Sequence, residues 1–292
     1  MLYIVLATLF WATSFPVIDH GISYISPLLF GFLRFAVASL LFALYLLMGG
    51  RRVGWRDVVT SPLLIYLALL NGSGYILQFQ AQALTTASKT ALFINTSPIF
   101  VALIERFVYG RRIHAYKVIA LILVLSGVFL ISTNLNLRDM SSINPGDFMN
   151  LGAALIWALF VVGSRRAVER FGEETFNMAL YLWAAVLLLP FSFLQEVRFH
   201  PAGMIHVIHL ALFCTIIAYM LYSRAVRFVS PTTVAITFTL EVVLATIISF
   251  LWLGERFTPV EGAGALLVLS GITMAGLSEG MNHSSAGEDG PA

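Results

Sequence analysis

The string Leu-Val-Leu-Ser-Gly occurs twice in the chain, at residues 123–127 and again at 267–271. The same offset of 144 residues pairs Tyr75 with Tyr219. Apolar helices draw on few residue types and can match by chance, but an identical string of five at equivalent places favours an internal duplication. The sequence therefore predicts two related halves.

The composition predicts a membrane protein. Of 292 residues, 59% are hydrophobic and 11% are charged, whereas soluble domains average about half and about a quarter. The apolar runs are long, which indicates membrane helices rather than the alternating strands of a β-barrel. A formal net charge of +2 argues against a nucleic-acid partner, and the single cysteine, Cys214, excludes an internal disulfide.

Polar and turn-forming segments divide the apolar sequence into ten predicted transmembrane helices. The first five lie in residues 1–133 and the second five in 147–277, and a connecting loop over 134–146 joins the two repeats. The remaining segment, 278–292, is small and polar and has no hydrophobic face. We expect it to be a disordered C-terminal tail.

The basic residues orient these helices. If the N-terminus faces the cytoplasm, twelve of the 17 Lys and Arg residues fall in cytoplasmic loops and Arg34 lies within a helix. The other four fall in outer loops: Lys89, Arg138, Arg198 and Arg256. This excess follows the positive-inside rule and predicts that both termini are cytoplasmic. Because each half has an odd number of spans, the second half enters the membrane from the opposite side. Many secondary transporters are built from such inverted repeats.

Four stretches of the chain resemble the EamA family of the drug/metabolite transporter superfamily: Phe-Trp-Ala-Thr-Ser-Phe at 10–15, Pro27 with Arg34-Phe35, 215–235, and 253–272. The resemblance implies an all-α fold of two five-helix repeats around a central cavity. It also implies export or exchange of small metabolites, often amino acids. The ninth helix departs from the family pattern, since members commonly read Leu-Glu-Pro where this chain reads Leu240-Glu241-Val242. Without the proline there is no basis for carrying over a kink at that point.

Glu241 lies near the centre of the ninth predicted helix, where a charge costs about 3 kcal/mol by insertion scales. It should therefore face a cavity, pair with a cation or carry a proton. We interpret it as a proton-coupling or substrate-amine site. The alternative is a neutral carboxyl group that forms a hydrogen bond between helices and steadies their packing.

Arg34 in the second helix is the other embedded charge. Its guanidinium group could bind a substrate carboxylate, or it could pair with Glu241 and take part in coupling. The alternative, which its place near the outer end of the helix favours, is that the side chain extends to the membrane interface.

The third and eighth helices each carry polar and aromatic residues on one face, as expected for opposite walls of a wet pocket. These residues are Asn71, Tyr75, Gln78 and Gln82 in the third helix, and Thr215, Tyr219 and Tyr222 in the eighth. Aromatic rings suit the apolar or cationic groups of a ligand, while hydroxyl and amide groups would orient it. The alternative is hydrogen bonding between helices, but the repetition in both halves favours a substrate site.

Four further residues complete the predicted substrate site. Trp11 and Trp157 are related by an offset of 146 and lie well inside the first and sixth helices, whereas tryptophans that anchor a protein lie at the membrane interface. Ser14 is close to Pro16, which removes a backbone hydrogen bond and marks a weak point in the first helix. Asn95 in the fourth helix is a candidate of the same kind.

The sequence has no motif typical of an enzyme or a metal site. His206 and His209 have no acidic or cysteine companion close in sequence, and we find neither a phosphate-binding loop nor a nucleophile–base pair. We therefore expect no catalytic residue, no metal and no cofactor.

The features together favour a secondary transporter in the cell membrane of a prokaryote, working by alternating access. We expect it to export a small amphipathic metabolite across the lipid bilayer, amino acids being the first candidates, with Glu241 as the coupling group. The rival is a non-transporting membrane scaffold or assembly subunit, which would have a packed, dry interior.

Overall fold

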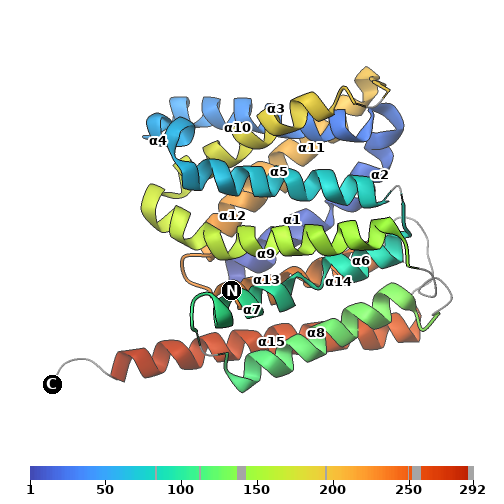
Figure 1. The fold of residues 1–292 in the computed structure, drawn as a ribbon, viewed down its shortest axis with the longest axis vertical. Coiled ribbons are helices and arrows are strands. Elements are labelled where there is room, and N and C mark those ends of the chain that lie inside the picture. The colour runs from blue at the N-terminus through green and yellow to red at the C-terminus, as the bar shows by residue number, and fades with distance from the viewer. Residues whose placement is uncertain are drawn as a thin grey trace.

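The computed structural model describes residues 1–82, 84–111, 113–136, 143–194, 196–248, 250–251 and 258–288, and these are helical nearly throughout (Figure 1). The first half contains α1 (Leu2–Ala12), α2 (Ser14–Tyr24), α3 (Pro27–Met48), α4 (Trp55–Thr60), α5 (Pro62–Gln82), α6 (Ala87–Ile94), α7 (Ser97–Phe107) and α8 (Ala115–Thr133). The second half contains α9 (Pro145–Phe171), α10 (Glu173–Phe191), the short 3-10 helix η2 (Pro201–Gly203), α11 (Met204–His209), the π-helix η3 (Leu210–Ile217), α12 (Ala218–Ala225), α13 (Pro231–Phe238), α14 (Leu240–Ile248) and α15 (Pro259–Glu288).

Nine stretches of the described chain are long and apolar enough to cross a bilayer, and Pro62–Gln78 within α5 is a shorter apolar helix. The prediction of an all-helical membrane protein is therefore confirmed. Four of the nine stretches join consecutive helices: Leu2–Tyr24, Lys89–Phe107, Pro201–Ala225 and Pro231–Ile248.

Three of these composite stretches are interrupted near the middle. The breaks lie at Thr13 between α1 and α2, at Asn95 and Thr96 between α6 and α7, and at Thr239 between α13 and α14. Each of the three threonine hydroxyls donates a hydrogen bond of 2.6 or 2.7 Å to the carbonyl three residues earlier. Asn95 and Thr239 are 144 residues apart, so two of the breaks fall at equivalent places. The stretch Pro231–Ile248, which is the ninth helix predicted from the sequence, is thus interrupted although Val242 stands where the family has proline.

The two helices that carry the duplicated string, α8 and α15, pack directly against each other (Figure 1). A Cβ atom added to Gly127 would lie 2.5 Å from the carbonyl oxygen of Gly264, and one added to Gly271 would lie 2.8 Å from that of Ala120. The two contacts are equivalent, because Gly127 and Gly271 are 144 residues apart and so are Ala120 and Gly264. The close approach of the two backbones therefore depends on glycine at equivalent positions of both halves.

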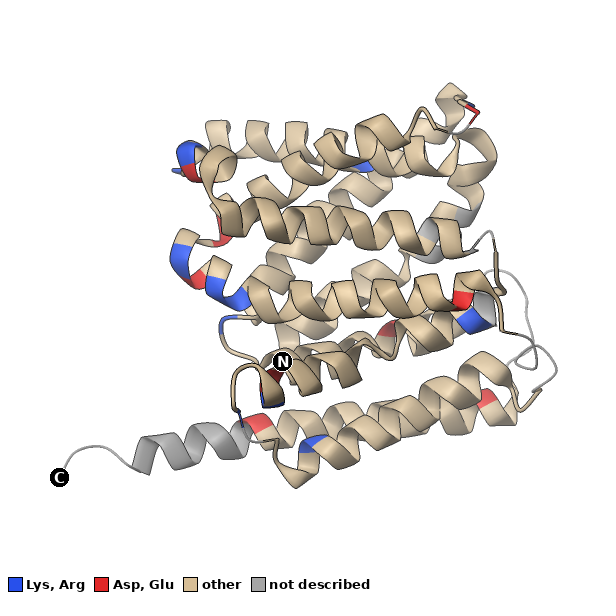
Figure 2. Ribbon diagram, in the orientation of Figure 1, with Lys and Arg blue, Asp and Glu red and all other residues tan. Residues whose placement is uncertain are grey.

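The chain begins and α15 ends at the same end of the bundle (Figure 1). Met1 lies against Gly276 of α15, and the Arg224 guanidinium lies 5.5 Å from the Tyr3 ring centroid. Figure 2 shows many of the described Lys and Arg residues at this end. Helix α15 continues to Glu288, so the segment expected to be disordered from 278 onwards is helical as far as that residue.

The glycine contacts predict different responses to the same small substitution. Gly127→Ala should lower the stability of the detergent-solubilised protein by about 1–3 kcal/mol, because the methyl group would overlap the backbone of α15. Gly152→Ala is the control, since the nearest atom to its Cβ would be 3.7 Å away and alanine favours helix over glycine. Thermal unfolding measures both, and equal melting temperatures for the two variants would contradict the packing account.

Candidate functional site

Tyr219 of α12 is the centre of a buried cluster between the halves. Asn71 of α5 donates a hydrogen bond of 2.9 Å to its hydroxyl, and the hydroxyl of Tyr75 lies 3.4 Å from the same oxygen. Tyr75 and Tyr219 are the residues that the offset of 144 pairs. Equivalent residues of the two halves thus meet in space, and both predicted polar faces contribute to one cluster.

The two predicted tryptophans contribute their rings to this cluster. Trp11 packs edge-on against Tyr219 and against Phe238, with ring centroids 5.2 Å apart in both cases. Trp157 packs edge-on against Tyr75 at 5.2 Å. These perpendicular contacts are a favoured geometry for aromatic pairs. Each half therefore supplies a tryptophan that packs on a tyrosine of the other half.

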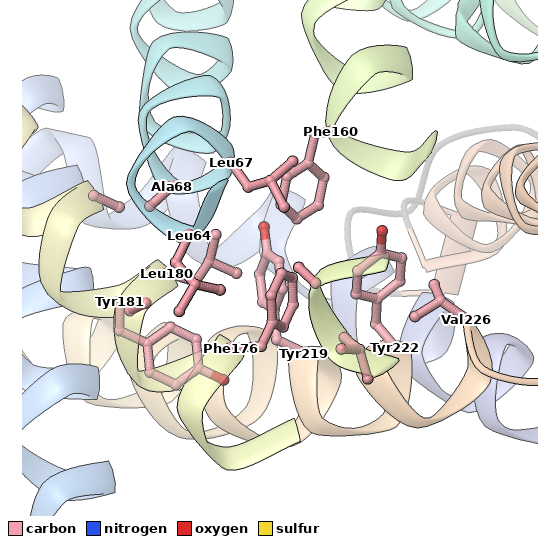
Figure 3. Packing of buried hydrophobic residues seen from close by; sticks show 14 of the residues in the cluster. Leu64, Leu67, Ala68, Phe160, Phe176, Leu180, Tyr181, Tyr219, Tyr222 and Val226 are labelled. Atoms are coloured by element: carbon pink, nitrogen blue, oxygen red, sulfur yellow. The ribbon is translucent and has the colours of Figure 1, made fainter. Parts of the chain in front are cut away.

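Tyr222 lies one turn beyond Tyr219 on the same face of α12. Its ring stacks on Phe160 with centroids 5.7 Å apart (Figure 3). The hydroxyl is buried and makes no hydrogen bond of good geometry to a described residue, although the side chain of Ser164 lies close enough to interact with it. A ligand that reached the cluster could form a hydrogen bond with this hydroxyl.

Arg34 is buried beside the cluster. Its Nε donates to the Thr215 hydroxyl over 2.7 Å and its Nη2 donates to the Cys214 carbonyl over 2.9 Å. Its guanidinium carbon lies 5.1 Å from the Tyr75 ring centroid. Since the side chain is only 3% exposed, the interpretation that it extends to the membrane interface is wrong. No ion pair with Glu241 occurs in the described chain.

Glu241 occupies the first turn of α14, just after the break at Thr239. The side chain is half-buried, and within the described residues it makes neither a hydrogen bond nor an ion pair. Arg34 is close enough to interact with it electrostatically. Among the described residues, therefore, Glu241 does not form the interhelical hydrogen bond that the alternative interpretation required.

The remaining predicted residues lie at or near the helix breaks and along α5. Ser14 is buried at the start of α2. Asn95 donates its side-chain amide to the carbonyl four residues earlier over 2.8 Å. Gln78 is half-buried and makes no hydrogen bond to another described residue, while the side chain of Gln82 lies outside the described part.

Sequence reasoning missed a second polar pair on α10. Asn177 donates to the hydroxyl of Ser223 over 3.0 Å, and the Tyr181 hydroxyl donates to a backbone carbonyl of η3 over 3.3 Å. Asn177 and Tyr181 have the i, i+4 spacing that singled out Asn71 and Tyr75 in α5. The same criterion, applied to the seventh helix, would have found them.

A buried ion pair joins the start of α6 to the start of α9, and both helices begin at the end of the bundle opposite the N-terminus (Figure 1). The Lys89 ammonium group lies 3.1 Å from the Asp147 carboxylate, and both side chains are almost fully buried. The hydroxyl of Thr85 donates to the same carboxylate over 2.7 Å. The sequence had placed Lys89 among the outer loop charges.

A similar pair lies at the other end of the bundle. Lys117 of α8 is 2.8 Å from the carboxylate of Glu279 in α15. That carboxylate also accepts hydrogen bonds from Ser230 and Thr233 at the start of α13. Glu279 is the second residue of the segment 278–292 that the sequence led us to expect as a disordered tail, and these contacts hold its side chain against α8 and α13. Ser230 caps α13 as Thr86, its equivalent at the offset of 144, caps α6.

The model of the EamA-like transporter family matches residues 1–133 and 144–277. The chain belongs to the EamA-like transporter family. It is therefore a membrane transporter and not an enzyme, and the resemblance found in the sequence is confirmed.

Its relatives span nearly the whole chain. It is 28% identical to an uncharacterized transporter of Archaeoglobus fulgidus, over 93% of this chain and 95% of that protein. It is 27% identical to the uncharacterized transporter YoaV of Bacillus subtilis, over 94% of this chain and 95% of that protein. It is 24% identical to a protein of Escherichia coli named "Probable amino-acid metabolite efflux pump", over 91% of both.

A crystal structure of a protein that is 18% identical has the same fold. The TM-score is 0.80, and the superposition covers 95% of this chain and 96% of the other.

The two tyrosines of α12 should respond differently to loss of the hydroxyl. Tyr219→Phe should lower the free energy of unfolding by about 1–3 kcal/mol, because the buried Asn71 amide loses its partner. Tyr222→Phe is the matched control and should cost clearly less, since its hydroxyl makes no hydrogen bond of good geometry to a described residue. Thermal unfolding without ligand measures both variants. A larger loss for Tyr222→Phe would contradict the hydrogen-bond assignment.

Proposed function

We propose that this transporter exports a small amine-bearing metabolite, amino acids being the first candidates, by alternating access of two inverted five-helix repeats. The single observation that carries the proposal is the carboxyl group of Glu241, which has no ion pair or hydrogen bond within the described residues and interacts electrostatically with Arg34, the residue that lies against Tyr75 of the aromatic cluster. The printed name of the Escherichia coli relative supports the substrate class and the direction.

The two inverted repeats of this proposal, which we take to form ten spans with both termini cytoplasmic, have support from three observations that bear on the repeat. The family model matches the chain twice, once in each half. Gly127 contacts α15, and its equivalent in the second half, Gly271, makes the same kind of contact with α8. Tyr75 and Tyr219, which are equivalent, lie together. An axis in the membrane plane that relates two antiparallel halves produces contacts of this kind.

The groups around the cluster suit an amine with an apolar body. Within the described residues Glu241 forms no ion pair, so an ammonium group could neutralise its carboxylate. Aromatic rings attract cations through their faces and also bind apolar groups. The hydroxyl of Tyr222 would then orient the ligand.

The broken helices provide a mechanism for opening one end at a time. The breaks at Asn95 and Thr239 divide equivalent spans into half-helices that can tilt separately. At one end Lys89 and Asp147 hold α6 to α9, and at the other Lys117 and Glu279 hold α8 and α15 to the start of α13. We propose that opening either end breaks the pair at that end and leaves the other intact.

Substitution of Glu241 tests the proposed coupling of transport to the proton gradient. Proteoliposomes loaded with a mixture of the standard amino acids should release some of them faster under a proton gradient, as mass spectrometry of the external solution would show. Glu241→Gln should remove the dependence on the gradient, because an amide cannot gain or lose the proton.

Glu174→Gln is the control, since Glu174 forms an exposed surface pair with Arg51 and such pairs contribute little. An unchanged response to the gradient in Glu241→Gln would reject the coupling role. Absence of release from wild-type proteoliposomes for every amino acid would reject the substrate class.

Reversible cross-linking tests the proposed gate at Lys89 and Asp147. In a Cys214→Ser background, the double variant Lys89→Cys/Asp147→Cys should stop releasing amino acids after treatment with a short, reducible bis-thiol reagent, and reduction should restore release. The linked α6 and α9 could no longer separate.

The matched control is Arg165→Cys/Glu169→Cys, which replaces an ion pair within α9 alone. The same reagent should leave its transport unchanged. Transport that continues with α6 and α9 linked would show that this end does not open there.

A further inference from the structure

The π-helix η3 leads directly into α12 and its two tyrosines. At the junction the backbone N–H of Ala218 bonds to the carbonyls of Phe213 and Thr215 and omits that of Cys214. In an α-helix the carbonyl four residues back, here that of Cys214, would be the partner. The wider π turn therefore releases this carbonyl from the helix.

Two side chains from the first half donate hydrogen bonds to the carbonyl that the helix leaves unbonded. The indole N–H of Trp11 and Nη2 of Arg34 each donate to the Cys214 oxygen over 2.9 Å. Nε of Arg34 also holds the hydroxyl of the next residue, Thr215, over 2.7 Å. A carbonyl oxygen has two lone pairs. The two side-chain donors therefore replace the backbone N–H that would bond to this carbonyl in an α-helix.

The turn controls which face of α12 points towards the cluster. A π turn contains one residue more than an α turn. If η3 relaxed to an α-helix, α12 would rotate by about 100° relative to α11. Tyr219 would then leave Asn71, and Tyr222 would leave Phe160.

We infer that Arg34 is a positioning residue: it stabilises the π turn of η3 and thereby directs Tyr219 and Tyr222 into the cluster. Arginine suits this task because its planar fork can bond to two neighbouring residues at once, whereas the ammonium group of lysine cannot reproduce that geometry. The inference rests on the proposed function only in treating the tyrosine face as the one that meets the ligand.

The test measures coupling between Arg34 and Tyr219 by thermal unfolding. In the wild-type background Tyr219→Phe should lower the melting temperature, whereas in an Arg34→Met background the same change should cause less than about a third of that fall. Residues that share a structural element give such non-additive effects, and distant ones do not. Gly127→Ala is therefore the control, and it should cause the same fall in both backgrounds.

A deletion provides the rescue. Removing Ile217 takes one residue out of η3, so an α turn would keep α12 in its present orientation without Arg34. In the Arg34→Met/ΔIle217 protein, Tyr219→Phe should again lower the melting temperature. A folded protein in which the effect does not return would overturn the inference.

If Arg34→Met does not fold, Thr215→Val replaces it in the experiment. This variant removes the hydroxyl that accepts from Nε of Arg34 and leaves the bond of Nη2 to the Cys214 carbonyl in place. The effect of Tyr219→Phe should then be reduced, and an undiminished effect would overturn the inference. None of these measurements involves transport, so the inference and the proposed function can fail separately.

Discussion

Hydrocarbon offers no water to the backbone, so each departure from the α-helix within a membrane has to be covered by the protein itself. Here a threonine hydroxyl bonds to a nearby carbonyl at each of the three breaks, Thr13, Thr96 and Thr239. Arg34 and Trp11 do the same for the π turn. Irregular backbone is tolerated at membrane depth where it is enclosed in protein or lines a cavity, and transporters place their sites at such points. The covered breaks and the π turn are therefore what allow the cluster around Tyr219 to exist.

The sequence predicted the elements that depend on local pattern. Helical spacing placed Asn71 and Tyr75 on one face, and the offset of 144 paired Tyr75 with Tyr219, which the structure brings together. Partners distant in sequence leave no local signal, so Lys89 and Glu279 were assigned to loop and tail, although Lys89 is in a buried ion pair and Glu279 is in a largely buried one. The break at Thr239 was not predicted because the family proline is absent there; in the structure the Thr239 hydroxyl bonds to the Ile236 carbonyl at this point.

The scaffold is repeated more faithfully than the chemistry. Tyr75 and Tyr219 are identical across the offset of 144, and the break at Asn95 matches that at Thr239. The embedded charge of Glu241 is not repeated: its equivalent position is Ser97, the first residue of α7. In the proposed mechanism, a symmetric scaffold would have two related conformations, open to either side, while the ligand would bind to groups that occur in one half only. Such a division would allow alternating access together with a single, oriented binding mode.

The two embedded charges have different freedom to act. Arg34 is held by Thr215, by the Cys214 carbonyl and by the Tyr75 ring, so a change of partner would disturb the backbone of η3. Glu241 has no bonded partner in the described chain, and it can bind a proton or an ammonium group without breaking an existing contact. A coupling group has to exchange partners between states of the cycle. That requirement favours Glu241 for coupling and leaves Arg34, whose charge acts on Glu241 electrostatically, as the fixed part of the site.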